Sequence, residues 1–167
     1  MSGSAIRRAR PEDLPGLLAI YNHYVATTHI TFDVEPRTLT QRETWFRQFG
    51  EAGRFQCFVA LADGAPAGWA SSHPFKDRAA YDSSVETSVY LAPEAQGRGL
   101  GKALYRTLLE ALAREDVHRA FGGIALPNPA SIALHEALGF SLVGTFHEVG
   151  RKFGKFWDVA WYGRALP

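Results

Sequence analysis

A glycine-rich segment, Gln96–Gly101 (QGRGLG), is the part of this sequence whose residue types most directly indicate ligand chemistry. A strand-like segment, 86–91, precedes it, and an amphipathic segment, 102–114, follows it. Glycines between a strand and a helix let the backbone approach a ligand and direct free N–H groups at it. The positive end of the helix dipole then favours an anion, and Arg98 and Lys102 add positive charge. The pattern predicts a phosphate cradle, and a turn that only caps a helix is the simpler interpretation.

The two commonest phosphate-binding motifs do not fit this segment. A P-loop ends in Gly-Lys-Ser/Thr, whereas Gly101 is followed by Lys102 and Ala103. A dinucleotide fingerprint spaces its three glycines differently and belongs to a repeated strand–helix–strand fold. The spacing therefore indicates a different class of phosphate site.

A second polar group is predicted on the helix that begins near Asn128. Asn128, Ser131 and His135 are spaced i, i+3 and i+7, so the three side chains share one helix face. A line of polar residues on a short helix is most often its solvated face. A ligand contact is the alternative interpretation, and it becomes the stronger one beside the upstream glycine segment.

The two segments together resemble signatures of the GNAT N-acetyltransferases: Gln/Arg-x-x-Gly-x-Gly/Ala at 96–101, and a helix whose Asn contacts pantetheine at 128–140. Segments 74–82, 85–90 and 134–139 resemble the phosphinothricin N-acetyltransferases, and the tail at 144–155 resembles relatives that act on methionine sulfone and sulfoximine. Asp77 and Ser83-Ser84 depart from the pattern of the phosphinothricin enzymes. These departures bear on which acceptor the protein uses and not on which reaction it catalyses.

The resemblance implies an acyltransferase that acetylates the α-amine of a small amino-acid-like substrate from acetyl-CoA, by direct transfer in a ternary complex. It implies no metal. It also implies a set of acetyl-CoA contacts, which are Val89, Tyr90, Leu91, Gln96, Gly97, Arg98, Gly99, Leu100, Gly101, Lys102, Asn128 and Ser131.

Glu86 is the candidate general base, because it interrupts an apolar, hydroxyl-rich strand where burial would raise a carboxyl pKa toward neutrality. An outward residue in a salt bridge is the alternative. His135 stands where many GNAT enzymes carry a tyrosine that protonates the departing thiolate, and it either does the same or orders a water.

The acceptor is expected to carry an anion beside its amine, which Lys76 and Arg78 would bind while Phe32 and Tyr81 shape the pocket. Alternatively, the two basic residues belong to a charged surface loop without a ligand, and Phe32 is a residue of the hydrophobic core.

Two other functions remain open. A catalytically silent acyl-CoA-binding sensor would also need the cradle, but Glu86 and His135 argue against it. An enzyme that acetylates another small amine, a lysine or a protein N-terminus is also possible, and the bulky loop residues Phe75 and Tyr81 argue weakly against a protein acceptor.

Composition limits the remaining possibilities. The 167 residues fit one domain, 1–167, and the formal charge of +1 does not favour a nucleic-acid or membrane partner. The single cysteine, Cys57, excludes an internal disulfide, and no apolar run approaches the roughly 20 residues that span a bilayer. These features predict a cytoplasmic protein.

Along the chain, segments whose apolar residues have the spacing of a strand are interspersed with segments that have the spacing of a helix. Strand patterns cover 5–9, 55–62, 67–73, 86–91, 119–126, 140–149 and 153–162, and helix patterns cover 11–27, 38–50, 100–114 and 128–138. The last two strands are predicted to pair around Gly150. We expect an α/β (α+β) domain of the GNAT type with a mixed, mostly antiparallel sheet, splayed between its central strands and flanked by about four helices. The resemblance also implies a homodimer, for which Trp157, Trp161 and Tyr162 offer apolar surface.

Overall fold

The computed structural model describes residues 5–167, in which seven strands form one sheet with the order β1-β2-β3-β4-β5-β7-β6. Neighbouring strands are antiparallel except β4 and β5, which are parallel. The expected mixed, mostly antiparallel sheet is therefore confirmed. The strands are β1 (Ala5–Arg8), β2 (Cys57–Ala62), β3 (Ala65–Pro74), β4 (Ser84–Leu91), β5 (Arg119–Ala125), β6 (Ser141–Lys152) and β7 (Lys155–Ala165).

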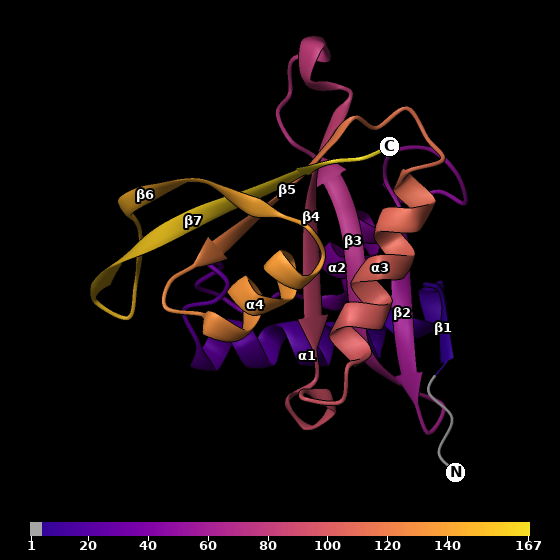
Figure 1. Cartoon of the computed structure of the whole chain (residues 1–167). Coiled ribbons are helices and arrows are strands. Elements are labelled where there is room, and N and C mark those ends of the chain that lie inside the picture. The colour runs from indigo at the N-terminus through magenta and orange to yellow at the C-terminus, as the bar shows by residue number, and fades with distance from the viewer. Residues whose placement is uncertain (1–4) are drawn as a thin grey trace.

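Four α-helices occur between residues 5 and 167, and they cover both faces of the sheet (Figure 1). They are α1 (Leu14–Thr27), α2 (Leu39–Phe46), α3 (Leu100–Leu112) and α4 (Pro129–Ala137). The helix α3 packs on one face through Leu104, Leu108 and Leu112, which are buried at helical spacing. The helices α1 and α2 lie on the opposite face. None of the helices in this part of the chain has the length and apolar character needed to cross a membrane.

The sheet opens between β4 and β5. The parallel ladder joins only Ser84–Glu86 to Arg119–Phe121, and Figure 1 shows the two strands diverging beyond it. A buried polar contact marks the point of divergence, because the Thr87 hydroxyl donates to the carbonyl of Phe121 at 3.1 Å. The predicted splay is confirmed, and it leaves backbone edges of both strands available to a ligand.

Alternating side chains on β3 and β4 form a polar row on the face that α1 and α2 cover. Glu86, Ser88 and Tyr90 of β4 lie directly opposite His73, Ser71 and Trp69 of β3. Opposite residues in an antiparallel pair share one face. The candidate base therefore belongs to the same surface as a set of polar and aromatic side chains from the neighbouring strand.

The prediction that the last two strands turn around Gly150 is wrong. The turn lies at Phe153 and Gly154, which both have positive φ angles (53° and 71°), and Gly150 pairs with Trp157 inside the ladder. Gly150 is required there for another reason. A Cβ atom at this position would lie 2.1 Å from the Phe32 ring, so only glycine allows this contact.

The β6–β7 hairpin extends away from the helices (Figure 1). Tyr162 was predicted to offer surface to a second subunit, and this is wrong: it is 6% exposed because β7 lies between β5 and β6. Trp157 and Trp161 are half-buried. The exposed apolar side chains of the hairpin are instead Leu142, Val143, Phe146, Val149, Phe153 and Phe156.

Candidate active site

The glycine segment forms the loop between β4 and α3, and its backbone geometry suits an anion. Gly97 and Gly99 have φ angles of 73° and 75°, in the left-handed region that favours glycine. Gly99 caps α3, and the first intrahelical hydrogen bond runs from the Ala103 N–H to the Gly99 carbonyl at 3.1 Å. The N–H groups of the first helical turn therefore have no partner within the helix, and the helix dipole adds positive potential to them.

Three side chains were expected to assist this cradle, and they differ in placement. Arg98 and Lys102 are exposed, as charged contacts to a phosphate group require. The Gln96 side chain is directed elsewhere: its Nε2 donates to the Tyr24 hydroxyl at 2.7 Å, and that hydroxyl donates to the Leu91 carbonyl. Gln96 thus fastens the loop to α1, which leaves its backbone as the part that can contact a ligand.

A narrow cavity of about 60 Å³ lies in the gap between β4 and β5. The residues that line it come from both strands, from α4 and its N-cap, and from the segment after α1, and they include five expected site residues. The full set is Ile30, Thr87, Ser88, Val89, Tyr90, Gly123, Ile124, Ala125, Asn128, Ser131 and His135. Asn128 also caps α4, since its Oδ1 accepts from the Ser131 N–H at 3.1 Å.

His135 is 4% exposed and is held by partners on both ring nitrogens. Nδ1 donates to the carbonyl of Ser131 at 2.8 Å, so the proton resides on Nδ1. Nε2 lies 3.2 Å from the Tyr105 hydroxyl, which is 2.6 Å from that of Thr87. Burial lowers the pKa of His135, so the ring is neutral at pH 7. A neutral ring whose Nδ1–H already donates to a backbone carbonyl is poorly suited to give that proton away.

Glu86 lines a larger cavity, of about 420 Å³, on the other side of the gap. Burial raises the pKa of its carboxyl group, and the positive charge of Lys76 opposes this shift in part. Five residues line both this cavity and the narrow one: Ile30, Ser88, Tyr90, Gly123 and Ala125. The remaining lining residues are Thr31, Phe32, Phe146, Val149, Val159 and Trp161.

The other expected acceptor contacts lie on the loop between β3 and β4. Phe75 anchors this loop by stacking on Phe121 at 4.6 Å between ring centres, and Tyr81 packs edge-on against Phe75 at 5.9 Å. Lys76, Arg78 and Tyr81 are exposed. None of these three residues lines a cavity described here, although Lys76 is near enough to act on Glu86 electrostatically.

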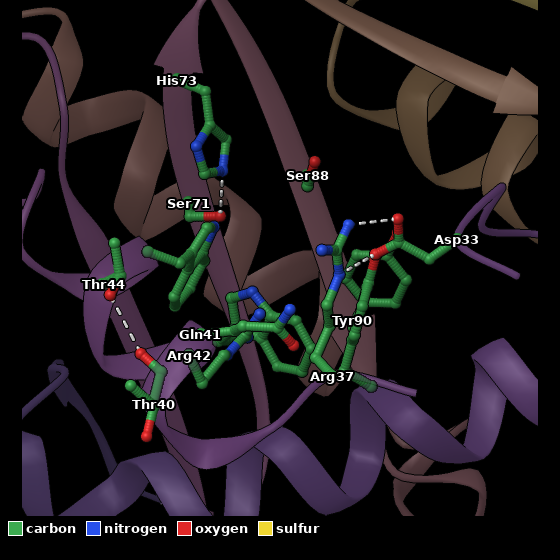
Figure 2. Close-up of a pocket in the computed structure, with 13 residues that line it drawn as sticks. Asp33, Arg37, Thr40, Gln41, Arg42, Thr44, Ser71, His73, Ser88 and Tyr90 are labelled. Carbon is green, nitrogen blue, oxygen red and sulfur yellow. Dashed lines mark hydrogen bonds and ion pairs between the residues drawn. The ribbon is translucent and has the colours of Figure 1, made fainter. Parts of the chain in front are cut away.

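A third cavity, of about 550 Å³, adjoins Ser88 and Tyr90 on the side of α2 (Figure 2). Sequence reasoning missed it. The available signal was the alternation of Trp69, Ser71 and His73 along β3, which places polar groups on a face that also buries a tryptophan. The lining residues are Tyr21, Asp33, Arg37, Thr40, Gln41, Arg42, Thr44, Trp45, Trp69, Ser71, His73, Ser88 and Tyr90.

Known proteins match this chain over most of its length. The profile of the acetyltransferase (GNAT) family matches residues 17–140. A phosphinothricin N-acetyltransferase of Streptomyces coelicolor is 51% identical, over 99% of this chain and 100% of the relative. A methionine sulfoximine/methionine sulfone acetyltransferase of Pseudomonas paraeruginosa is 35% identical over 93% and 91%. The crystal structure of a phosphinothricin acetyltransferase from Sinorhizobium meliloti in complex with acetyl-CoA has a TM-score of 0.93 and 34% identity, covering 98% of this chain and 88% of that one.

Proposed function

Because this chain belongs to the GNAT family of acetyltransferases, we propose that it transfers the acetyl group of acetyl-CoA to the α-amine of a small amino-acid-like acceptor. All 167 residues form the transferase domain in this proposal. One observation carries it: at the gap between β4 and β5, the narrow cavity that α4 residues line adjoins the Glu86 cavity. Ser88 and Tyr90 line both cavities, so an acyl donor and an amine can meet there.

The donor side is assigned to backbone groups and α4. In this proposal the N–H groups of Gly97–Lys102 bind the pyrophosphate of acetyl-CoA, and Arg98 and Lys102 add charge to the contact. Asn128 and Ser131 border the path of the pantetheine arm. The backbone of Val89–Leu91, which β5 leaves unpaired, binds the arm and polarises the thioester carbonyl.

Glu86 acts as the general base on the acceptor side. An α-amino group is mostly ammonium at pH 7, so a proton must leave before nitrogen can attack. The Glu86 carboxylate takes that proton, directly or through a water. The N–C bond then forms as the C–S bond breaks, and the coenzyme A thiolate leaves. In this direct transfer no residue of the chain is acetylated, which requires donor and acceptor to be bound together.

His135 is assigned a positioning role rather than that of the acid. Its Nδ1 proton is held by the Ser131 carbonyl, and its Nε2 faces the hydroxyls of Tyr105 and Thr87. This chain of hydrogen bonds joins α4, α3 and β4 at the mouth of the gap. His135 therefore fixes the width of the gap, and the departing thiolate takes its proton from solvent.

The acceptor's carboxylate is expected to determine which amines react. We assign it to Lys76, with Arg78 reaching from the same loop. A charge-assisted hydrogen bond contributes about 1.5–3 kcal/mol, so an analogue without the carboxylate should lose about tenfold or more in kcat/KM. A panel of acceptors with acetyl-CoA, followed by thiol release, measures this. Equal kcat/KM for methionine sulfone and its decarboxylated amine would contradict the assignment.

We further propose that two copies pair through the exposed apolar side chains of the β6–β7 hairpin. Large contiguous patches of exposed apolar side chains are rare on monomers and mark interaction surfaces. Phe146 and Val149 also line the Glu86 cavity, so a second copy would help to enclose it. Sedimentation at micromolar concentration should give a dimer, and Phe156→Glu should shift it to the monomer. A wild-type protein that sediments as a monomer would contradict the proposal.

A further inference from the structure

Arg42, on the α2 face of the sheet, is a buried cation without an anion. The residue is 5% exposed, and its Nε and Nη2 atoms have no hydrogen-bond partner in residues 5–167. A capping box explains why α2 begins where it does, since Thr38 and Gln41 each accept from the other's backbone N–H. That start fixes Arg42 on the inward side of the helix.

Aromatic rings hold the guanidinium in place. Its central carbon lies 3.5 Å from the ring centre of Trp45, 4.5 Å from that of Trp69 and 5.3 Å from that of Tyr21. Such contacts stabilise a cation but leave its N–H donors unsatisfied. Burial lowers the pKa of Arg42 to about 10, which still leaves the group charged at pH 7.

The cavity around Arg42 offers no carboxylate to pair with it. Asp33 is the acidic residue in the lining, and it is already bound to Arg37 by hydrogen bonds of 2.8 Å and 2.5 Å and to the Tyr21 hydroxyl at 2.6 Å. Figure 2 shows this ion pair at one side of the cavity, away from Arg42. His73 is neutral, because burial lowers its pKa to about 4. The cavity is therefore suited to an anionic group that comes from a ligand.

This cavity is continuous in its lining with the Glu86 cavity, because Ser88 and Tyr90 belong to both. Arg42 stacks on Trp69, the cross-strand partner of Tyr90, four residues along β4 from Glu86. At about 3.3 Å per residue, the strand position opposite Trp69 lies about 13 Å from Glu86 along β4. An amino acid with an oxygen about 6 Å from its amine, plus a hydrogen bond of about 3 Å at each end, spans about 12 Å.

We propose that Arg42 binds an oxyanion at the end of the acceptor's side chain while the acceptor's amine lies at Glu86. This rests on the proposed function and adds a specificity-determining residue to it: Arg42 selects amino acids whose side chain of three or four atoms ends in a phosphinate, carboxylate or similarly charged oxygen. Lys76 holds the α-carboxylate at the opposite end. Selectivity for the side chain and for the α-carboxylate thus resides on different elements.

The test compares two acceptors of similar length, phosphinothricin and norleucine, which differ in the charge at the end of the side chain. Wild-type protein should acetylate phosphinothricin with a kcat/KM about 10- to 100-fold above that of norleucine. Arg42→Gln should bring this ratio close to one by slowing phosphinothricin, with norleucine little changed. Lys76→Met should slow both acceptors and keep the ratio, because both carry the α-carboxylate.

Arg47→Gln is the matched control, since Arg47 follows α2 directly but is exposed; its ratio should equal that of the wild type. Arg42→Lys keeps the charge beside the rings and should retain part of the ratio, so it replaces Arg42→Gln if the latter fails to fold. Equal kcat/KM values for the two acceptors in wild type, or an unchanged ratio in a folded Arg42 variant, would overturn the inference and leave the proposed function intact.

Failure of the proposed function has a different signature: wild-type protein would acetylate neither amino acid. Calorimetric titration with phosphinothricin in the presence of coenzyme A then tests Arg42 independently of turnover. The dissociation constant should rise about tenfold or more in Arg42→Gln. An unchanged constant in the folded variant would overturn the inference.

Discussion

Glu86→Gln is expected to lower kcat by about 10²–10⁴-fold, the usual cost of losing a general base. The substitution keeps the shape of the side chain and removes its basicity. Affinity for acetyl-CoA should not change, because Glu86 lines the cavity on the acceptor side of the gap and not the one beside α4. Steady-state kinetics with calorimetry of acetyl-CoA binding separates the two effects.

The dependence of the rate on pH provides a second test of Glu86 as the base. The carboxylate form of Glu86 is the active one, so the wild-type rate should fall as pH falls through the pKa of Glu86. Since burial raises that pKa, the acidic limb should lie above the range of an ordinary carboxyl group. The variant should lack this limb and recover at high pH, where the acceptor amine deprotonates in solution. Wild-type turnover and an unchanged limb in the variant would mean that Glu86 is structural.

Gly101→Asp is expected to weaken acetyl-CoA binding by about 100-fold or more, which corresponds to losing two charge-assisted hydrogen bonds. Gly101 lies in the first turn of α3, where a carboxylate would repel a bound pyrophosphate and compete for the same N–H groups. Calorimetric titration with acetyl-CoA measures the loss.

Gly101→Ala separates charge from size. Gly101 is buried, and a Cβ atom there would lie 3.1 Å from Cδ1 of Leu91, at the end of a flexible side chain that can shift by a few tenths of an ångström. The alanine variant should therefore stay folded and lose much less affinity than the aspartate variant. Equal affinity in a folded Gly101→Asp and in the wild type would exclude the cradle as the pyrophosphate site.

The parts of the site that local sequence determines could be predicted. A run of glycines between a strand and a helix was expected to leave free N–H groups at the start of the helix, and Gly97 and Gly99 adopt positive φ angles that favour glycine there. Asn128 likewise caps the helix that follows it. Glu86 stood out because a carboxylate interrupts an apolar strand, and its burial follows from the helices that cover that face.

The parts that depend on distant packing could not be predicted. The sequence pattern around Arg42 is that of a short polar helix, which indicates a surface residue. Arg42 is buried because α2 packs onto Trp69. The turn between β6 and β7 was misplaced for the same reason. Gly150 and Gly154 are equally good turn residues by sequence, and the contact of Gly150 with Phe32 decides between them.

Transfer of a labelled acetyl group to methionine sulfoximine tests the central claim most directly, because this acceptor has two nitrogens. The protein is incubated with acetyl-CoA carrying ¹³C at the acetyl carbonyl, and the product is followed by NMR and mass spectrometry. The account predicts one acetyl group per free coenzyme A, bound as an amide to the α-nitrogen. Label on the sulfoximine nitrogen, label on the protein, or release of coenzyme A without an acetylated acceptor would contradict it.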